Sequence, residues 1–261
     1  MKKYKAILFS QENNVATITI NQPQSMNALT ADILTEIGSA IDTVEADESI
    51  QVLVITGSGE KSFVAGANIK GFVEMDTKQG TEFSRLGNEV FYKLSTLRQP
   101  TIAAVNGYAL GGGMELAMAC DIRVASENAI FGQPEVGLGI PPGFGGTQRL
   151  PRLINPAIAK ELIFTGRNVR SGEAKEIGLV NKVVPQTDLM VEVMTLADQI
   201  MKNAPLAVEK SKQLINEGLD MPLETGLQLE SEGFGSLFET EDQKIGAKAF
   251  INKEKPIFNR K

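Results

Sequence analysis

The sequence predicts a mainly parallel α/β core followed by a helical C-terminal region. Strand-like and helix-like segments alternate along the first 185 residues, and such alternation is typical of parallel sheets covered by helices. From residue 186 to residue 261 the apolar pattern is helical throughout, with no strand-like alternation. The composition therefore changes once, near Pro185, and no long Pro/Gly/Ser linker separates independent domains.

The chain opens with two strand-like segments and a helix. Residues 6–9 and 15–20 read as strands, the second alternating as Val-Ala-Thr-Ile-Thr-Ile, and the residues between them predict a hairpin. Thr30 is a suitable N-cap, because apolar side chains then recur at helical spacing as far as Val44. A buried strand over 52–56 follows and ends at Gly-Ser-Gly.

The same alternation continues through the middle of the chain. A helix from about residue 79 to 97 precedes a strand over 101–106. Three consecutive glycines, 111–113, then open a short helix. Two further strands are predicted at 122–125 and 129–131.

The C-terminal region consists of helical windows. Its last helix begins after Thr240, because Thr240-Glu-Asp-Gln matches a capping box, and ends near Phe250. The preceding helical windows cover residues 187–201, 205–217 and 221–238.

Composition excludes several classes of function. The formal net charge of −6 makes nonspecific attraction to nucleic acid or to anionic membranes unexpected. No apolar run has the length of a membrane span, and Met1-Lys-Lys-Tyr-Lys leads into a strand rather than a signal peptide. We therefore expect a cytoplasmic protein that binds neither nucleic acid nor membranes.

The absence of histidine narrows the chemistry further. Ser-His-Asp hydrolysis, Cys-His catalysis and histidine-ligated zinc all need a residue that this chain lacks. Cys120 is the only cysteine, so no intrachain disulfide forms, and its apolar helical surroundings favour packing over reactivity. Proton transfer must therefore fall to carboxylates, lysine or tyrosine.

Four glycine-containing segments stand where loops meet strands or helices. Taken singly, each is explained by a tight turn or a close helix–sheet contact. The triple glycine follows a strand and precedes a helix, which leaves backbone N–H groups free to face a ligand. The triple glycine lacks the residue spacings of the Walker and dinucleotide-binding loops. Its N–H groups therefore suit an oxygen that becomes negative during reaction, with a second N–H donor from residues 65–67. The segments are 62–70, 106–115, 131–135 and 142–148.

Two glutamates accompany these glycines. Glu115 follows the triple glycine directly, and Glu135 follows Pro134 in a loop, with a pair of predicted strands between them. If the chain runs down one strand and back along the next, both carboxylates reach one cavity, where one can be protonated and the other ionised. The alternative for each glutamate is a solvated surface position.

These residues carry a resemblance to a known family. Ser-Phe-Val-Ala-Gly-Ala-Asn-Ile-Lys, Ala-Val-Asn-Gly-Tyr-Ala-Leu-Gly-Gly-Gly-Met-Glu and Phe-Gly-Gln-Pro-Glu-Val-Gly-Leu-Gly resemble segments of the enoyl-CoA hydratase, or crotonase, family. The resemblance extends from Asn27-Ala-Leu29 to Thr240-Glu-Asp-Gln and is closest to short-chain enoyl-CoA hydratases, or 3-hydroxybutyryl-CoA dehydratases. It implies a crotonase-like spiral of ββα units over 1–185 that contains the active site. It also implies a helical subdomain over 186–261 that serves oligomerisation, in a homotrimer or a homohexamer built as a dimer of trimers.

The resemblance also implies an activity and its residues. Backbone N–H groups of Ala67 and Gly112 would form an oxyanion hole, while Glu115 and Glu135 would be the catalytic acid–base pair. The implied reaction is reversible addition of water to a short trans-2-enoyl-CoA, as in fatty acid metabolism and β-oxidation. No metal or redox cofactor is expected, because coenzyme A belongs to the acyl-CoA substrate and fixed dipoles bear the developing charge.

Residues that would contact the coenzyme follow from the same resemblance. Asn68 stands where the family more commonly has Asp, so a hydrogen bond made by an acid there is in question. Phe250 and Lys253 lie near the final helix and would act from a neighbouring subunit. A solvated Lys253 is equally compatible with the sequence. The predicted contacts are Ala65, Asn68, Ile69, Lys70, Phe250 and Lys253.

Two alternatives stay open from the sequence. The same oxyanion hole serves isomerisation, decarboxylation or thioester hydrolysis, although an isomerase needs one proton shuttle and the paired glutamates favour hydration. A different class is RNA binding, which a few relatives show. Residues 75–93 mix acidic and basic side chains and form no basic stripe, so the sequence offers little for that role.

Overall fold

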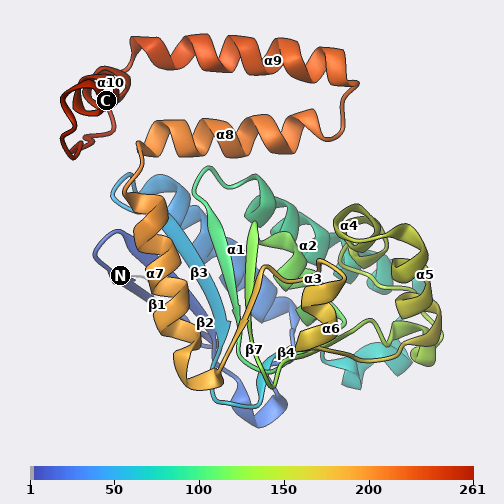
Figure 1. Ribbon diagram of the computed structural model, residues 1–261. Helices are drawn as coiled ribbons and strands as arrows, with labels where there is room; N and C mark the ends of the chain where they lie inside the picture. Colours follow the sequence, from blue (N-terminus) through green and yellow to red (C-terminus); the bar gives the residue numbers. More distant parts are fainter. Residues whose placement is uncertain (1–2) are drawn as a thin grey trace.

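The computed structural model describes residues 3–261, so the start of the segment Met1-Lys-Lys-Tyr-Lys lies outside the described residues. Its larger sheet has six strands in the order β1-β2-β3-β5-β7-β10, and Figure 1 shows it behind the helix α7. The pair β1/β2 is antiparallel and the remaining pairs are parallel. The strands are β1 (Ile7–Glu12), β2 (Val15–Ile20), β3 (Val52–Gly57), β5 (Thr101–Val105), β7 (Ile122–Ser126) and β10 (Lys182–Val184).

A second sheet of four short strands has the order β4-β6-β8-β9. Its first three strands are parallel and β9 is antiparallel to β8. The chain passes repeatedly from a strand of the large sheet to a strand of the small one, as β3 to β4, β5 to β6 and β7 to β8. The strands are β4 (Ser62–Ala65), β6 (Tyr108–Leu110), β8 (Ile130–Gly132) and β9 (Val169–Arg170).

A helix follows each of these strand pairs, which gives the ββα repeat that the family resemblance implies. The helix after β4 is α2, the helix after β6 is α3, and a 3₁₀ turn (η3) with α4 follows β8. The predicted α/β class with a mainly parallel core is therefore confirmed. These elements are α2 (Thr77–Thr96), α3 (Gly112–Ala119), η3 (Glu135–Leu138) and α4 (Gly146–Leu153), followed by α5 (Pro156–Thr165) and α6 (Ser171–Glu176).

Local capping explains where the N-terminal helices begin. Thr30 caps α1 (Ala31–Ala46) by accepting a hydrogen bond from the Ile33 N–H at 3.2 Å, as predicted. Helix α2 begins slightly before the predicted start, because Asp76 and Gln79 form a reciprocal capping box. The short strands β4 and β6 were not predicted, whereas β8 lies close to the strand predicted at 129–131.

Two apolar clusters hold the core together. The larger lies between the sheets and the helices α1, α2 and α3, where β3 and β5 are buried along their whole length. The smaller lies on the other face of the large sheet, where α7 (Leu189–Met201) covers it with Leu189, Val193 and Ala197. Burying both faces is what requires the continuous apolar strands seen in the sequence.

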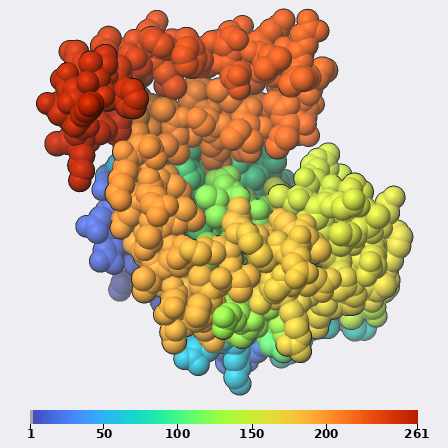
Figure 2. All heavy atoms as spheres, viewed as in Figure 1, coloured from blue at the N-terminus to red at the C-terminus, as the bar shows by residue number. Residues whose placement is uncertain are grey.

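The last three helices form a layer above this core, coloured orange to red in Figures 1 and 2. Thr240 caps the last of them through its side chain, but the second half of the predicted capping box is missing because the Thr240 N–H donates to the Leu237 carbonyl. The division near residue 185 stays a prediction, while α7 itself packs on the sheet. The three helices are α8 (Pro205–Gly218), α9 (Leu223–Ser236) and α10 (Glu241–Asn252).

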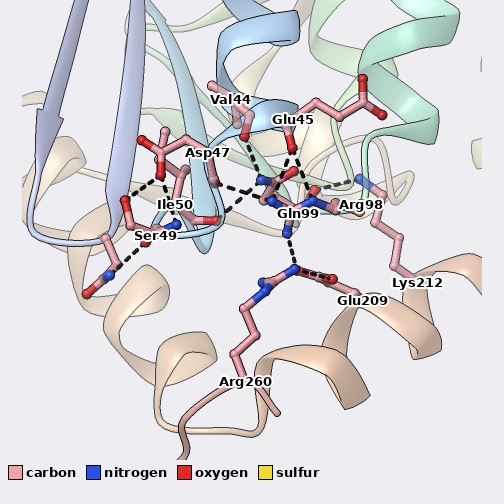
Figure 3. A network of polar contacts seen from close by, with 11 residues as sticks. Val44, Glu45, Asp47, Ser49, Ile50, Arg98, Gln99, Glu209, Lys212 and Arg260 are labelled. Atoms are coloured by element: carbon pink, nitrogen blue, oxygen red, sulfur yellow. Dashed lines mark hydrogen bonds and ion pairs between the residues drawn. The ribbon is translucent and has the colours of Figure 1, made fainter.

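A polar network fastens this layer to the core (Figure 3). The Glu209 carboxylate of α8 accepts from Arg98 at 2.8 Å and from Arg260 at 2.7 and 3.0 Å. Lys212, also on α8, pairs with Asp121 at 2.7 Å. The C-terminal tail and α8 are therefore anchored to the same point of the α/β core. None of the helices within residues 3–261 has the length and apolar character of a bilayer span.

Candidate active site

Helix α3 begins at the edge where β4 and β6 end. Gly111, just before it, has φ 49°, and a Cβ there would lie 2.6 Å from an oxygen of Glu135. A Cβ on Gly113 would lie 1.9 Å from the Val64 carbonyl oxygen, so α3 packs directly against the backbone of β4. Glycine is required at both positions, one for backbone conformation and one for close approach.

Glu115, in the first half of α3, is 1% exposed. Its Oε1 accepts hydrogen bonds from the Phe144 N–H at 2.8 Å and the Gly146 N–H at 2.7 Å. Both donors belong to the glycine-rich loop at the start of α4. Because one oxygen is fixed by two backbone groups, the other is left for a reactant.

Glu135 reaches the same place from the small sheet. Strand β8 runs parallel to β6, and the Gly111 N–H donates to the Gly132 carbonyl at 2.8 Å, so the two loops leave adjacent strand ends. The strands between the two glutamates are not a hairpin, since β7 lies in the large sheet and β8 in the small one. Glu135 Oε2 is buried and has no hydrogen-bond partner among residues 3–261.

The two carboxyl groups affect each other's protonation. Burial raises the pKa of Glu115 to about 7, and the nearby Glu135 charge contributes to the rise, whereas the two amide donors oppose the shift. Burial also raises the pKa of Glu135. Interacting carboxyl groups of this kind titrate as a pair rather than independently.

Two backbone N–H groups beside these carboxylates are free. Leu29 forms a parallel bridge opposite Ala67, donating to the Gly66 carbonyl at 2.9 Å and accepting from the Asn68 N–H at 2.8 Å. The N–H of Ala67 therefore points away from Leu29. Gly112 is the first residue of α3, so its N–H has no partner within the helix. Neither N–H has an acceptor within the described chain. The structure thus brings the predicted oxyanion donors to neighbouring strand ends, since Ala65 pairs with Leu110.

The predicted coenzyme contacts Ala65, Asn68, Ile69 and Lys70 form a continuous rim. Ala65 ends β4, and Asn68 caps a 3₁₀ turn (η2, Ile69–Glu74) by accepting from the Lys70 N–H at 3.2 Å. An Asp side chain would make the same cap, so the exchange leaves this backbone geometry intact. Ile69 and Lys70 are exposed beside the site.

Phe250 and Lys253 lie far from this rim. Phe250 is 87% exposed on α10, and Lys253 ends that helix with φ 58°. Figure 1 places α10 at the upper left, away from α3 near the centre and α4 at the right. Within one chain, therefore, these two predicted contacts are not brought to the site.

Other residues take part in the site although the sequence assigned them no role. Gln133 is fully buried and donates from Nε2 to the Gly111 carbonyl at 3.1 Å, while its Oε1 has no partner within residues 3–261. The amides of Phe144 and Gly146 orient Glu115. The sequence signal for these two amides was the glycine-rich run 142–148, where small residues permit close backbone approach.

Cys120 lies at the end of α3 and is buried, as its apolar surroundings predict. Burial raises the pKa of its thiol to about 12, so the thiolate needed for nucleophilic attack is scarce at neutral pH. Within residues 3–261, no three His, Cys, Asp or Glu side chains lie close enough to hold a metal ion together.

Two sheets joined by ββα units define a crotonase-type fold. Its site holds a carboxylate pair beside free backbone amides. A crystal structure of an enoyl-CoA hydratase from Bacillus anthracis matches it with a TM-score of 0.95 and 39% identity, covering 98% of this chain and 100% of that one. The enoyl-CoA hydratase/isomerase family model matches residues 10–261. The chain belongs to the enoyl-CoA hydratase/isomerase family.

Particular relatives are similar over nearly the whole chain. A short-chain-enoyl-CoA hydratase from Clostridium acetobutylicum is 54% identical, covering 95% of each chain. A crotonyl-CoA hydratase from Syntrophomonas wolfei is 49% identical, covering 98% of each chain. The family predicted from the glycine-rich segments is therefore confirmed.

Proposed function

We propose that the protein is an enoyl-CoA hydratase that reversibly adds water to short-chain trans-2-enoyl-CoA of the crotonyl-CoA type, giving 3-hydroxyacyl-CoA. The observation that carries the proposal is the pairing of Glu115 and Glu135 at one site beside two free backbone N–H groups. The names of the two curated relatives, short-chain-enoyl-CoA and crotonyl-CoA hydratase, support a short acyl chain.

The proposed reaction begins with the thioester oxygen between the amides of Ala67 and Gly112. These donors polarise the conjugated system and make C3 electrophilic; each is worth about 3 kcal/mol when it faces developing charge. Glu115 takes a proton from water as the water oxygen bonds to C3. The electrons of the double bond move onto the thioester oxygen as an enolate, and Glu135 delivers a proton to C2. Dehydration follows the same path in reverse.

The hydrogen bonds around the two carboxyl groups support this division of labour, whereas burial and the Glu135 charge, which raise the pKa of Glu115, oppose it. Glu115 must be ionised to accept a proton, and its two amide hydrogen bonds favour the ionised form. Glu135 must be protonated to donate, and its buried Oε2 without a partner within residues 3–261 suits a carboxylic acid better than a carboxylate. After one turnover the proton has moved from Glu135 to Glu115 and exchange with solvent restores the pair.

Coenzyme A enters as part of the substrate, and the proposed mechanism uses no further cofactor. The amides of Ala67 and Gly112 bear the enolate charge, which is the task a metal would otherwise perform. The rim formed by Ala65, Asn68, Ile69 and Lys70 would contact the pantetheine and adenine parts, largely through its main chain.

A homotrimer, or a homohexamer made from two trimers, is part of the proposal. Large apolar side chains are exposed along α8, α9 and α10, and patches of this kind mark subunit interfaces. Phe250 and Lys253 would then contact the coenzyme bound to a neighbouring subunit. The acidic charge and the single cysteine support a cytoplasmic location. The exposed residues include Ile215, Leu219, Leu223, Leu227, Phe234, Phe238, Phe250 and Ile251.

Incubation of the purified protein with crotonyl-CoA, without added cofactor, tests the proposed function. We expect loss of the enoyl thioester absorbance and formation of 3-hydroxybutyryl-CoA. In D₂O the product should carry deuterium at C2, because Glu135 exchanges its proton with solvent. An isomerase would shift the double bond without adding oxygen. No 3-hydroxyacyl product from crotonyl-CoA or longer 2-enoyl thioesters would reject the assignment.

A further inference from the structure

Three residues on one face of α2 contact the glycine-rich loop that precedes α4. The Ser84 hydroxyl donates to the Gly143 carbonyl at 2.6 Å, and the Asn88 side-chain amide donates to the same oxygen at 2.9 Å. Gly87 lies on the same face, at helical spacing from Ser84, and a Cβ there would overlap the Phe144 ring. Helix α2 therefore holds both the backbone and a side chain of this loop.

The carbonyl that Ser84 and Asn88 hold belongs to the peptide group that binds the catalytic carboxylate. On the other side of the Gly143 carbonyl carbon, the Phe144 N–H donates to Glu115 Oε1 at 2.8 Å. Hydrogen bonds in such a chain polarise one another, so a peptide whose carbonyl accepts two bonds is a stronger donor at its N–H. The two α2 side chains thus act on Glu115 without touching it.

Side chains alone supply the hydrogen bonds of the Gly143 carbonyl. No backbone N–H within residues 3–261 donates to this oxygen. Asn88 also approaches the next glycine of the loop, since its Oδ1 lies 3.4 Å from the position a Cβ would have on Gly145. The orientation of this peptide is therefore set by α2 rather than by the first turn of α4.

The Phe144 ring anchors the same loop independently of these polar contacts. It is 5% exposed and packs edge-on against Phe83 and Phe91 of α2, with ring centroids 5.2 and 5.7 Å apart. A Cβ on Gly112 would lie 3.1 Å from the ring, so the start of α3 also packs on it. Removing the two polar side chains should therefore leave the loop in place, with its peptide less firmly oriented.

We propose that Ser84 and Asn88 are positioning residues for Glu115. Through the peptide between Gly143 and Phe144 they orient and strengthen the hydrogen bond that keeps this carboxylate ready to accept a proton. This inference rests on the proposed hydratase function. Neither side chain touches the substrate or the reacting atoms in this role.

Charged groups act on Glu115 from two elements. Glu135 faces it from η3, and Arg149 attracts it from α4. The other charged side chains of α2 and α4 are exposed, except Lys93, which is held in an ion pair. Of the strands packed on α3, β4 has no titratable residue and β6 has only Tyr108. The two α2 side chains of the proposal are neutral, so replacing them changes none of these charges. The exposed charged side chains are Lys78, Glu82, Arg85, Glu89 and Arg152.

The pH dependence of crotonyl-CoA hydration by Ser84→Ala, Asn88→Leu and the double variant tests the proposal. Leucine keeps the branched shape of asparagine without its N–H donor. In the double variant the weakened peptide N–H stabilises the Glu115 carboxylate less, so the acidic limb of kcat/KM should move up by about half a pH unit. The kcat should fall by about tenfold with KM nearly unchanged, because no substrate contact is removed. Ser84→Thr keeps the hydroxyl and should stay close to wild type.

Thr81→Ala is the matched control. Thr81 lies about one turn before Ser84 on α2, and its hydroxyl donates to the Thr77 carbonyl of the same helix at 2.7 Å. This variant should keep the wild-type kcat and acidic limb. An unmoved limb in the double variant, or an equal shift in Thr81→Ala, would overturn the proposal, the second because a general loosening of α2 would then explain the effect.

A second measurement keeps the proposal testable without activity. Infrared difference spectra between each protein and its Glu115→Gln counterpart report the titration of the Glu115 carboxyl. That titration should move to higher pH in the double variant, or in Asn88→Leu alone if the double variant does not fold, because Asn88 is exposed. An unmoved titration contradicts the inference. If wild type hydrates no enoyl thioester, the proposed function fails, and this titration still decides whether Ser84 and Asn88 act on Glu115.

Discussion

At the scale of single residues, the central feature is a glutamate whose burial lowers the stability of the folded state. Glu115 has its pKa raised from an ordinary 4.5 to about 7 by burial and by Glu135. The folded state therefore disfavours the carboxylate relative to the unfolded chain. Backbone donors from Phe144 and Gly146 recover only part of that cost. Functional sites commonly sacrifice stability in this way.

Replacing Glu115 by Gln should therefore stabilise the protein at neutral and alkaline pH. The raised pKa penalises folding only above the unfolded value of 4.5 and fully above about 7; the penalty corresponds to about 3 kcal/mol at most. Chemical denaturation of both proteins should show equal stability near pH 4.5, a difference growing up to pH 7, and a constant difference above it. A variant less stable than wild type at pH 8 would contradict this account of the site.

A site residue can be predicted from the sequence only where its residue type is one that the chemistry requires. With no histidine in the chain, Glu115 and Glu135 stood out beside glycines, and the structure brings them together. Gln133 gave no such signal, because glutamine is an ordinary surface residue. Its burial depends on how β8 packs, which no local pattern records.

At the scale of elements, the site depends on how closely α3 approaches the small sheet. Gly113 has no side chain, and a Cβ there would lie 1.9 Å from the Val64 carbonyl oxygen of β4. That contact keeps the start of α3, with its free N–H groups, beside the end of β4, which leads to Ala67. The oxyanion donors are thus placed by packing of backbone on backbone.

The variant Gly113→Ala should destabilise the fold by about 3 kcal/mol or more, since the new Cβ must displace backbone. Thermal unfolding and the yield of folded protein would measure this. Gly80→Ala is the control: Gly80 lies in α2, where an added Cβ would have nothing within 4 Å, and alanine there should stabilise by about 0.5–1 kcal/mol. Equal effects of the two substitutions would show that α3 is not packed as tightly as described.

The long elements followed from the sequence, whereas only one strand of the small sheet did, β8, which lies within a residue of the strand predicted at 129–131. Helix α1 and strands β2, β3 and β5 have apolar patterns long enough to identify and lie where predicted. Strands β4, β6 and β9 have four residues or fewer, and their pairing joins residues distant in sequence, such as Ala65 with Leu110. Yet this sheet creates the site, because its parallel order aligns the ends of β4, β6 and β8.

At the scale of the whole molecule, the helical layer leaves apolar surface uncovered. Leu219 and Leu223, at the turn between α8 and α9, are 79% and 77% exposed. The layer is anchored to the core through Glu209 and Lys212, so its outer face is held in a fixed position (Figure 3). A rigid apolar face of this kind suits association with further copies of the chain.

Substituting Leu219 and Leu223 together by Asp should weaken assembly, because each buried leucine contributes about 1.5–3 kcal/mol to an apolar interface. Light scattering coupled to size exclusion should show wild type as a trimer or hexamer and the double variant as smaller species. Leu8→Asp, at a 54% exposed position on the edge strand β1, should not change assembly. A monomeric wild type would contradict the proposed oligomer without affecting the site.

The most direct test of the central claim is the rate of crotonyl-CoA hydration by wild type, Glu115→Gln and Glu135→Gln under identical conditions. If the two carboxyl groups form one acid–base pair, each variant should lose about a hundredfold or more in kcat while keeping its fold, since each removes a proton-transfer group. Hydration at the wild-type rate by either variant would contradict the claim that this pair carries the reaction.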